Sequence, residues 1–206
     1  PDCAYPYKGL CGAGVAYKFI RHLYRVMELP WEDEDAYMDI LALGTVCDIM
    51  PLTDENRIFV KRGLRRLTNS TNLGINALKK ALGLDGEPIE VHHLSFRIGP
   101  SLNSTGRLES AKEGVELLLT DDPARAESLA QDMAKLNELR KEMTDRGVRT
   151  ATDWVRKDIR MIPTEDGVKE KKIGDDKVIV LYMPGIHESI AGLIASKLKE
   201  AFYRPT

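Results

Sequence analysis

The sequence predicts an α/β protein that is mostly helical, with one long helix between two parts. In the first 120 residues, apolar side chains recur at helical spacing, and prolines or glycines end each stretch. A single helical pattern then continues from residue 123 to about residue 158. After it, a short apolar run at residues 178–182 is followed by a turn and another helical pattern, an order typical of an α/β unit.

Composition and charge narrow the function classes. The chain has 206 residues, of which 43% are hydrophobic and 30% charged, enough for a folded core. Its net charge of −2 argues against a surface that coats nucleic acid as a whole, although it leaves room for a local basic groove. No uncharged apolar run reaches the roughly 20 residues of a membrane span. The three cysteines form no C-x-x-C pair, which favours a reducing cytoplasm and gives no sign of zinc.

Four amphipathic helices are expected in the first part. The first covers residues 10–29, buries a face that includes Tyr17 and Leu23, turns Lys18 outward and ends before Pro30. The second covers residues 33–48, with three acids where the helix dipole favours negative charge. Thr53 is the expected N-cap of the third, and the fourth covers residues 73–82 before a glycine.

Residues 85–108 are rich in Gly, Pro, Ser and Asn, so we expect strand fragments and loop there. A capping box from Ser110 to Glu113 then starts another helix. Asp122 followed by Pro123 starts the long helix, which at ~1.5 Å per residue is a rod on the order of 50 Å long. Its apolar stripe fades in the second half, so it is interpreted as a connector and not as a sustained coiled coil.

Asp48 is the one charged residue between residues 41 and 53. Helical spacing places it on the same inward face as Leu41 and Gly44. A buried carboxylate needs a cation, a metal ion or several N–H donors. Two interpretations therefore stay open: Asp48 caps the turn before Pro51 by accepting backbone N–H bonds, or it is one part of a metal site.

Two further segments combine polar groups with glycines. Residues 97–107 hold two arginines, an amide and three hydroxyls, which suit a phosphate site but also an ordinary loop whose arginines pair with surface acids. Residues 185–192 open a helix after an apolar run, where free N–H groups favour an anion. There, Ser189 is equally well explained as an N-cap and His187 as a surface histidine.

Other patterns favour structural interpretations. His92 and His93 are adjacent on a segment expected to be extended, so their side chains should point to opposite faces and not share a metal ion. Gly12 and Gly14 do not form a dinucleotide-binding fingerprint, because no strand precedes them. A basic helix face is expected to be solvated surface that could line a nucleic-acid path; it comprises Arg57, Lys61, Arg62, Arg65 and Arg66.

Three stretches together carry a resemblance to a known family. They are LALGTVCDIMPLTDENRIFVKRGLRRL, FRIGPSLNSTGRLESAKEGVELLLTDDPARAESL and HESIAGLIASKLKEAFYRPT. In this order they resemble the RecJ-type single-stranded-DNA-specific exonucleases of the DHH phosphoesterase superfamily. The resemblance implies that residues 1–120 form the mostly helical C-terminal part of a DHH catalytic domain. It also implies that residues 121–158 form a connector helix and that residues 159–206 begin an α/β DHHA1 substrate-binding domain.

The resemblance also implies roles for particular residues. Asp48 matches an aspartate that ligates the active-site metal ions, Mn²⁺ or Mg²⁺, and oxygen ligands suit such hard cations. Asp48 and Arg107 are then the expected catalytic residues. The residues expected to bind the single-stranded DNA are Arg97, Asn103, Gly106, Arg107, His187, Ser189 and Gly192. The implied activity is 5′-to-3′ hydrolysis of phosphodiester bonds in DNA repair or recombination, in the cytoplasm. The resemblance indicates no membrane contact and no particular protein partner.

Several departures from the family pattern limit this expectation. The chain starts at Pro1 and ends at Thr206, so we expect a fragment of a longer protein. The family's aspartate pair and Asp-His-His motif are absent from the chain, and one carboxylate cannot hold two metal ions, so we expect the isolated residues to be inactive. The alternatives are a phosphodiesterase for short oligonucleotides or cyclic dinucleotides, or a non-catalytic nucleic-acid-binding or scaffold relative.

Overall fold

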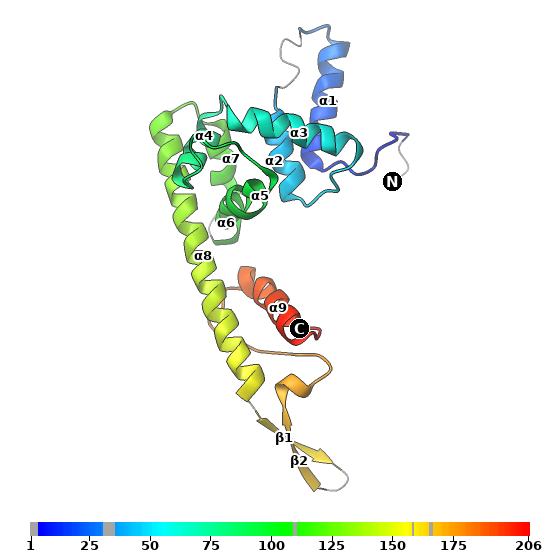
Figure 1. Ribbon diagram of the computed structural model, residues 1–206, viewed down its shortest axis with the longest axis vertical. Helices are drawn as coiled ribbons and strands as arrows, with labels where there is room; N and C mark the ends of the chain where they lie inside the picture. The colour runs from blue at the N-terminus through cyan, green and yellow to red at the C-terminus, as the bar shows by residue number, and fades with distance from the viewer. Residues whose placement is uncertain (1–3, 31–35, 109–110, 158, 165–166) are drawn as a thin grey trace. The chain divides into compact units, whose positions relative to one another are not determined.

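The structure is a computed structural model that describes residues 4–30, 36–108, 111–157, 159–164 and 167–206 (Figure 1). The chain divides into two compact units. Unit 1 consists of Pro1–Gly106 and Ser110–Ala134, and unit 2 of Arg107–Glu109 and Lys135–Thr206. Among the described helices, none is both long and apolar enough to span a membrane.

Unit 1 is built from helices. They are α1 (Gly12–Val26), α2 (Met38–Cys47), α3 (Asp54–Thr68), α4 (Leu73–Ala81), α5 (Val91–His93), the π-helix η1 (Leu94–Ile98), α6 (Gly99–Leu108), α7 (Ala111–Leu119) and the start of α8 (Pro123–Lys157). The predicted first four helices and the long helix are confirmed, although α2 begins at Met38 and the start expected for it at residues 33–35 lies outside the described residues. Thr53 occupies the N-cap position of α3 as expected, although its side chain makes no capping hydrogen bond.

Helix α2 is the central element of unit 1. Its side chains are apolar on almost every side, and most of them, including Leu41, Ala42 and Val46, are buried. It packs against both α1 and α3, and the Tyr17 ring meets Phe59 edge-on with 5.5 Å between centroids (Figure 1). A helix that is hydrophobic all round belongs in a core, and α2 contributes Ala42, Leu43 and Val46 to the main hydrophobic core of unit 1.

The expected faces of α1 are partly wrong. Tyr17 is buried as predicted, but Leu23 is exposed. Lys18, expected to face solvent, is only partly exposed because its ammonium group binds the Glu55 carboxylate on α3. The pairing partner lies 37 positions away in the sequence, so local periodicity gave no sign of it.

The prediction of strand fragments and loop for residues 85–108 is wrong for most of that segment. Residues 91–108 form a continuous helical run through α5, η1 and α6. Pro100 cannot donate a backbone hydrogen bond and would crowd the carbonyl four residues earlier, and the wider turn of η1 directly before it accommodates that defect. His92 and His93 consequently lie with ring centroids 3.9 Å apart, and not on opposite faces.

Unit 2 contains the rest of α8, the strands β1 (Ile159–Thr164) and β2 (Gly167–Lys172), the 3₁₀-helix η2 (Ile173–Asp175) and α9 (Glu188–Phe202). The strands form an antiparallel hairpin in which Ile159 pairs with Lys172. The hairpin was not predicted, because β2 is mostly charged and lacks the apolar pattern of a strand. Helix α9 confirms the expected last helix, and its buried face packs on the second half of α8 through Ala151, Ile190, Ile194 and Leu198.

The predicted strand at residues 178–182 is wrong. The segment has the alternating burial of a strand, with Ile179 at 1% and Val180 at 70% exposure. It nevertheless pairs with no other strand in the described part of the chain; the Ile179 N–H donates to the Pro205 carbonyl at 2.8 Å. An apolar run predicts an extended conformation, but a strand also needs a neighbouring backbone to pair with.

Candidate active site

Asp48 lies directly after the last residue of α2, in the C-cap position, and is exposed. The expectation that it faces inward is therefore wrong. The main chain itself closes the turn: the N–H groups of residues 48, 49 and 50 donate to the carbonyls of Gly44, Val46 and Thr45 at 3.0, 3.0 and 3.1 Å. Since these N–H groups are already bonded, the carboxylate is not needed to cap the turn.

The position of this carboxylate is unfavourable for the helix. The C-terminal end of a helix carries partial negative charge, so an anion there costs roughly 0.3–1 kcal/mol. Among the described residues, the Asp48 side chain has no hydrogen-bond or ion-pair partner that would offset this cost. A bound cation would reverse the sign of the interaction. The Asp48 carboxylate is therefore exposed and accessible to a cation.

Two other helices pack closely against the end of α2. A Cβ atom built on Gly44 would lie 2.9 Å from the Ala13 Cβ, at the start of α1. A Cβ built on Gly99, at the start of α6, would lie 2.5 Å from the Cys47 Sγ. Real Cβ atoms essentially never come this close to a neighbouring atom. Only glycine therefore fits at these two positions without a shift in the packing. The two glycines thus hold the starts of α1 and α6 next to the Asp48 turn, a role that no pattern in the sequence indicated.

Asn56 fixes the other side of the turn. Its Nδ2 donates to the Gly9 carbonyl at 2.7 Å and to the Pro51 carbonyl at 3.0 Å, and Tyr7 adds a longer bond to Pro51 at 3.4 Å. Asn56 is fully buried, and its Oδ1 has no hydrogen-bond partner. The segment that follows Asp48 is therefore tied by side chains to the segment that precedes α1.

Within the predicted phosphate-binding segment, residues 97–107, some polar side chains are exposed and others form hydrogen bonds with the protein itself. Asn103 and Gly106 are exposed on α6. The guanidinium of Arg97 donates to the Leu82 carbonyl at the end of α4. Arg107 lies in the last turn of α6, and its side chain is outside the described residues. The three hydroxyls face the protein and donate to main-chain carbonyls; they belong to Ser101, Ser104 and Thr105. The segment thus offers Asn103 and part of Arg97 to a phosphate, but not its hydroxyls.

The remaining predicted substrate-binding residues belong to unit 2. His187 is the N-cap of α9: its Nδ1 accepts a bond from the Ser189 N–H at 3.3 Å and lies 2.7 Å from the Ser189 Oγ. The N-cap is therefore His187 and not Ser189. Gly192 is exposed and borders an apolar cavity of about 460 Å³. The structure brings these three residues together at the start of one helix.

The described residues contain no group of three or more His, Cys, Asp or Glu side chains that could hold a metal ion. His92 lies 3.2 Å from Glu90 and has no second acidic neighbour of this kind. Asp48 supplies one oxygen ligand, so any metal ion bound there needs further ligands from outside the described residues.

Ile49 is expected to be a strained position next to the candidate ligand. It has a φ of 55° and is 89% exposed, and β-branched residues rarely adopt this left-handed conformation. We predict that Ile49→Asn raises the free energy of unfolding by about 1 kcal/mol, because asparagine tolerates that conformation. Ile49→Val, which keeps the branch, should leave it unchanged. Urea denaturation of the three proteins checks this, and equal stability of the Asn and Val variants would refute it.

Cys47 should be an unreactive thiol. Burial, and secondly the charge of Asp48, raise its pKa to about 11. At pH 8 the reactive thiolate is then about 0.1% of the total, and we predict alkylation on the order of 100-fold slower than for free cysteine. The rate should rise about tenfold per pH unit between pH 8 and 10. Peptide mapping after iodoacetamide treatment measures it; rapid labelling at pH 8 would contradict the burial seen here.

Comparison with known proteins gives one consistent result. The chain is 36% identical over 205 residues to the single-stranded-DNA-specific exonuclease RecJ of Bacillus subtilis, covering 100% of this chain and 24% of that protein. It is 33% identical over 214 residues to RecJ of Escherichia coli, covering 99% of this chain and 35% of that protein. No family model matches the chain.

Solved structures agree with the sequence comparison. A crystal structure of the exonuclease RecJ bound to manganese superposes with a TM-score of 0.80 at 32% identity, covering 99% of this chain and 48% of that one. The chain belongs to the RecJ family. RecJ from Thermus thermophilus in complex with Mg²⁺ gives a TM-score of 0.78 at 32% identity, covering 98% of this chain and 29% of that one. The resemblance predicted from the three stretches is thus confirmed. The chain spans about a quarter to a third of the length of the curated RecJ proteins it matches.

Proposed function

We propose that this chain is part of a metal-dependent exonuclease that hydrolyses phosphodiester bonds of single-stranded DNA from the 5′ end, in DNA repair or recombination in the cytoplasm. One observation of the structure carries this proposal: the carboxylate of Asp48 is exposed, lacks a partner among the described residues and opposes the dipole of α2. Membership of the RecJ family supports the substrate, since its relatives are named as single-stranded-DNA-specific exonucleases.

In this proposal the two units have separate tasks. Asp48 is a ligand of Mn²⁺ or Mg²⁺, the ions in the related crystal structures. Such ions activate a water molecule and stabilise the leaving oxygen. Asn103, Gly106, Arg97 and Arg107 position the scissile phosphate, with Arg107 also stabilising its charge. His187, Ser189 and Gly192 hold the strand or its 5′ end.

The layout proposed for the chain follows the same assignment. Residues 1–120 are the C-terminal part of a DHH catalytic domain, residues 121–158 the connector, and residues 159–206 the start of a DHHA1 domain. Asp48 alone cannot hold two metal ions, so the other ligands come from the rest of the complete gene product. The complete gene product that contains this chain is therefore the active species.

The test is a nuclease assay on that complete gene product. Single strands labelled at either end, the matching duplex, a dinucleotide and a cyclic dinucleotide are each incubated with Mn²⁺, with Mg²⁺ and with chelator. We expect metal-dependent release of nucleotides from the 5′ end of the single strand, and little from the duplex. Faster cleavage of the dinucleotides would favour the alternative phosphodiesterase. Absence of hydrolysis with either metal would favour a non-catalytic relative.

A further inference from the structure

Asn56 is a fully buried amide on α3 that joins two segments of unit 1. Its Nδ2 donates to the Pro51 carbonyl, three residues after Asp48, at 3.0 Å, and to the Gly9 carbonyl at 2.7 Å. An amide nitrogen carries two hydrogens, so these bonds use its whole donor capacity. Because the side chain is 0% exposed and both acceptors belong to unit 1, the contacts are internal and do not depend on what covers the surface.

The segment that carries Asp48 is held in different ways at its two ends. At the start, the main-chain N–H groups of residues 48–50 donate to carbonyls of α2. Among the described residues, the next main-chain bond along the chain runs from the Arg57 N–H to the Thr53 carbonyl at 3.4 Å, where α3 begins. The Pro51 carbonyl lies between these two sets of bonds and is held by the Asn56 side chain. Asn56 therefore fixes the far end of the segment that starts with Asp48.

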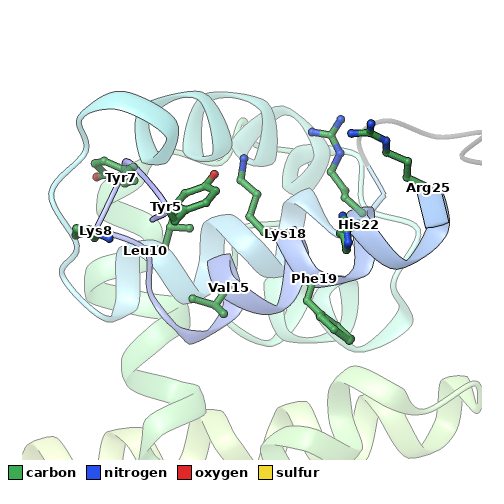
Figure 2. Close-up of a pocket in the computed structure, with 10 residues that line it drawn as sticks. Tyr5, Tyr7, Lys8, Leu10, Val15, Lys18, Phe19, His22 and Arg25 are labelled. Atoms are coloured by element: carbon green, nitrogen blue, oxygen red, sulfur yellow. The ribbon is translucent and has the colours of Figure 1, made fainter. Parts of the chain in front are cut away.

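Tyr7 contacts the same segment but holds it less tightly. Figure 2 shows Tyr7 on the stretch of chain that leads into α1. Its hydroxyl lies 3.4 Å from the Pro51 carbonyl and 3.3 Å from the Thr53 carbonyl, both near the long end of hydrogen-bond distances. The bond from Asn56 to Pro51 is shorter, at 3.0 Å, and its donor is buried. Of the two side chains, Asn56 is therefore the stronger constraint on Pro51.

A shift of the Pro51 carbonyl would be transmitted to Asp48, because only three residues, about 10 Å of extended chain, separate the two. Groups that orient a metal ligand without touching the ion commonly change metal affinity 10- to 100-fold when they are replaced. We propose that Asn56 is a positioning residue, which fixes the backbone after Asp48 so that the carboxylate is preorganised for a divalent cation. This inference rests on the proposed function, because it requires Asp48 to be a metal ligand.

Lys79 allows this role to be separated from a purely structural one. Its side chain is buried, and its Nζ donates to the carbonyls of Leu67 and Thr68, at the far end of α3, at 2.9 and 2.8 Å. Lys79→Met removes both bonds but leaves the Asp48 turn untouched. Asn56→Leu removes two bonds at the start of the same helix with a side chain of similar size that cannot donate. Both variants should be less stable than the wild type, and only Asn56→Leu should affect the turn.

The experiment uses the complete gene product and measures two quantities. Mn²⁺ affinity is obtained by titration from the electron paramagnetic resonance signal of free Mn²⁺, and we expect Asn56→Leu to weaken at least one site about 10- to 100-fold. Lys79→Met should change the affinity less than about twofold. Hydrogen exchange of residues 48–53, followed by mass spectrometry without metal, should become faster in Asn56→Leu and stay unchanged in Lys79→Met. If Asn56→Leu does not fold, Asn56→Ser replaces it, since one hydroxyl donor loses at least one of the two bonds.

The outcomes separate this inference from the proposed function. Weaker Mn²⁺ binding together with faster exchange, in the Asn56 variant alone, supports the positioning role. If the wild type binds Mn²⁺ and hydrolyses single strands but the Asn56 variant binds Mn²⁺ as the wild type does, the inference is wrong and the proposed function stands. If the Asn56 and Lys79 variants weaken Mn²⁺ binding equally, the loss comes from lower stability and the positioning role is overturned. If the wild type binds no Mn²⁺, both the proposed function and the inference fail.

Discussion

Asp48→Asn is expected to reduce metal-dependent hydrolysis of single-stranded DNA by at least about 100-fold, because the amide is a poor substitute for a charged oxygen ligand. Asparagine keeps the size and shape of the side chain, and the hydrogen bonds that close the turn come from the main chain. The loss should therefore appear in activity and not in folding. Initial rates of nucleotide release with Mn²⁺, for the complete gene product and its variant, measure it.

The same substitution should leave stability unchanged or raise it by roughly 0.3–1 kcal/mol in the absence of metal, since it removes a negative charge from the C-terminal end of α2. Asp54→Asn is the matched stability control. Asp54 lies in the first turn of α3, where negative charge is favourable, so its removal should destabilise by a similar amount. If Asp48→Asn destabilises the protein while activity persists, Asp48 is a structural residue and not a metal ligand.

Gly63→Ala is expected to destabilise unit 1 by about 2–4 kcal/mol, the largest stability effect that we predict. Gly63 is a buried residue of α3 at the contact with α2. A Cβ atom there would come closer than 3.0 Å to both the Ala42 Cβ and the Met38 carbonyl oxygen. Since one of these is backbone, the two helices would have to move apart. Movement of α2 also displaces the turn that carries Asp48.

The control for this prediction is Gly114→Ala, in the middle of α7 in the same unit. A Cβ there would meet its nearest atoms at 3.8 and 3.9 Å, an ordinary van der Waals separation. Alanine favours helix over glycine, so this variant should gain up to about 1 kcal/mol. Urea denaturation monitored by circular dichroism compares the two. Equal stabilities of Gly63→Ala and Gly114→Ala would refute the close packing of α2 and α3.

The regular helices could be predicted from the sequence because local signals specify them. Helix α8 starts at Pro123 after Asp122, whose Oδ1 accepts the Ala124 N–H at 2.9 Å, as the start signal indicates. Helix α4 ends next to Gly83, which has a φ of 64° that glycine adopts without strain. In both cases the residues that determine the boundary lie next to it.

The sequence-based predictions were wrong where residues far apart in the sequence determine the structure. Helical spacing placed Asp48 on an inward face, but α2 ends at Cys47, and spacing does not apply beyond the last helical residue. Propensity predicted a loop around Pro100, whereas burial of Leu94 and Ile98 in the core of unit 1 keeps the segment helical. The contacts of Lys18 and Tyr5 were missed because both side chains bind Glu55, which lies on another helix.

Asp48 is expected to ligate a divalent cation. The most direct test counts the Mn²⁺ ions bound by the complete gene product and by its Asp48→Asn variant, from the electron paramagnetic resonance signal of free Mn²⁺ during a titration. We predict two tightly bound ions in the wild type, and the loss or at least 100-fold weakening of at least one of them in the variant. Identical titration curves for the two proteins would contradict the claim.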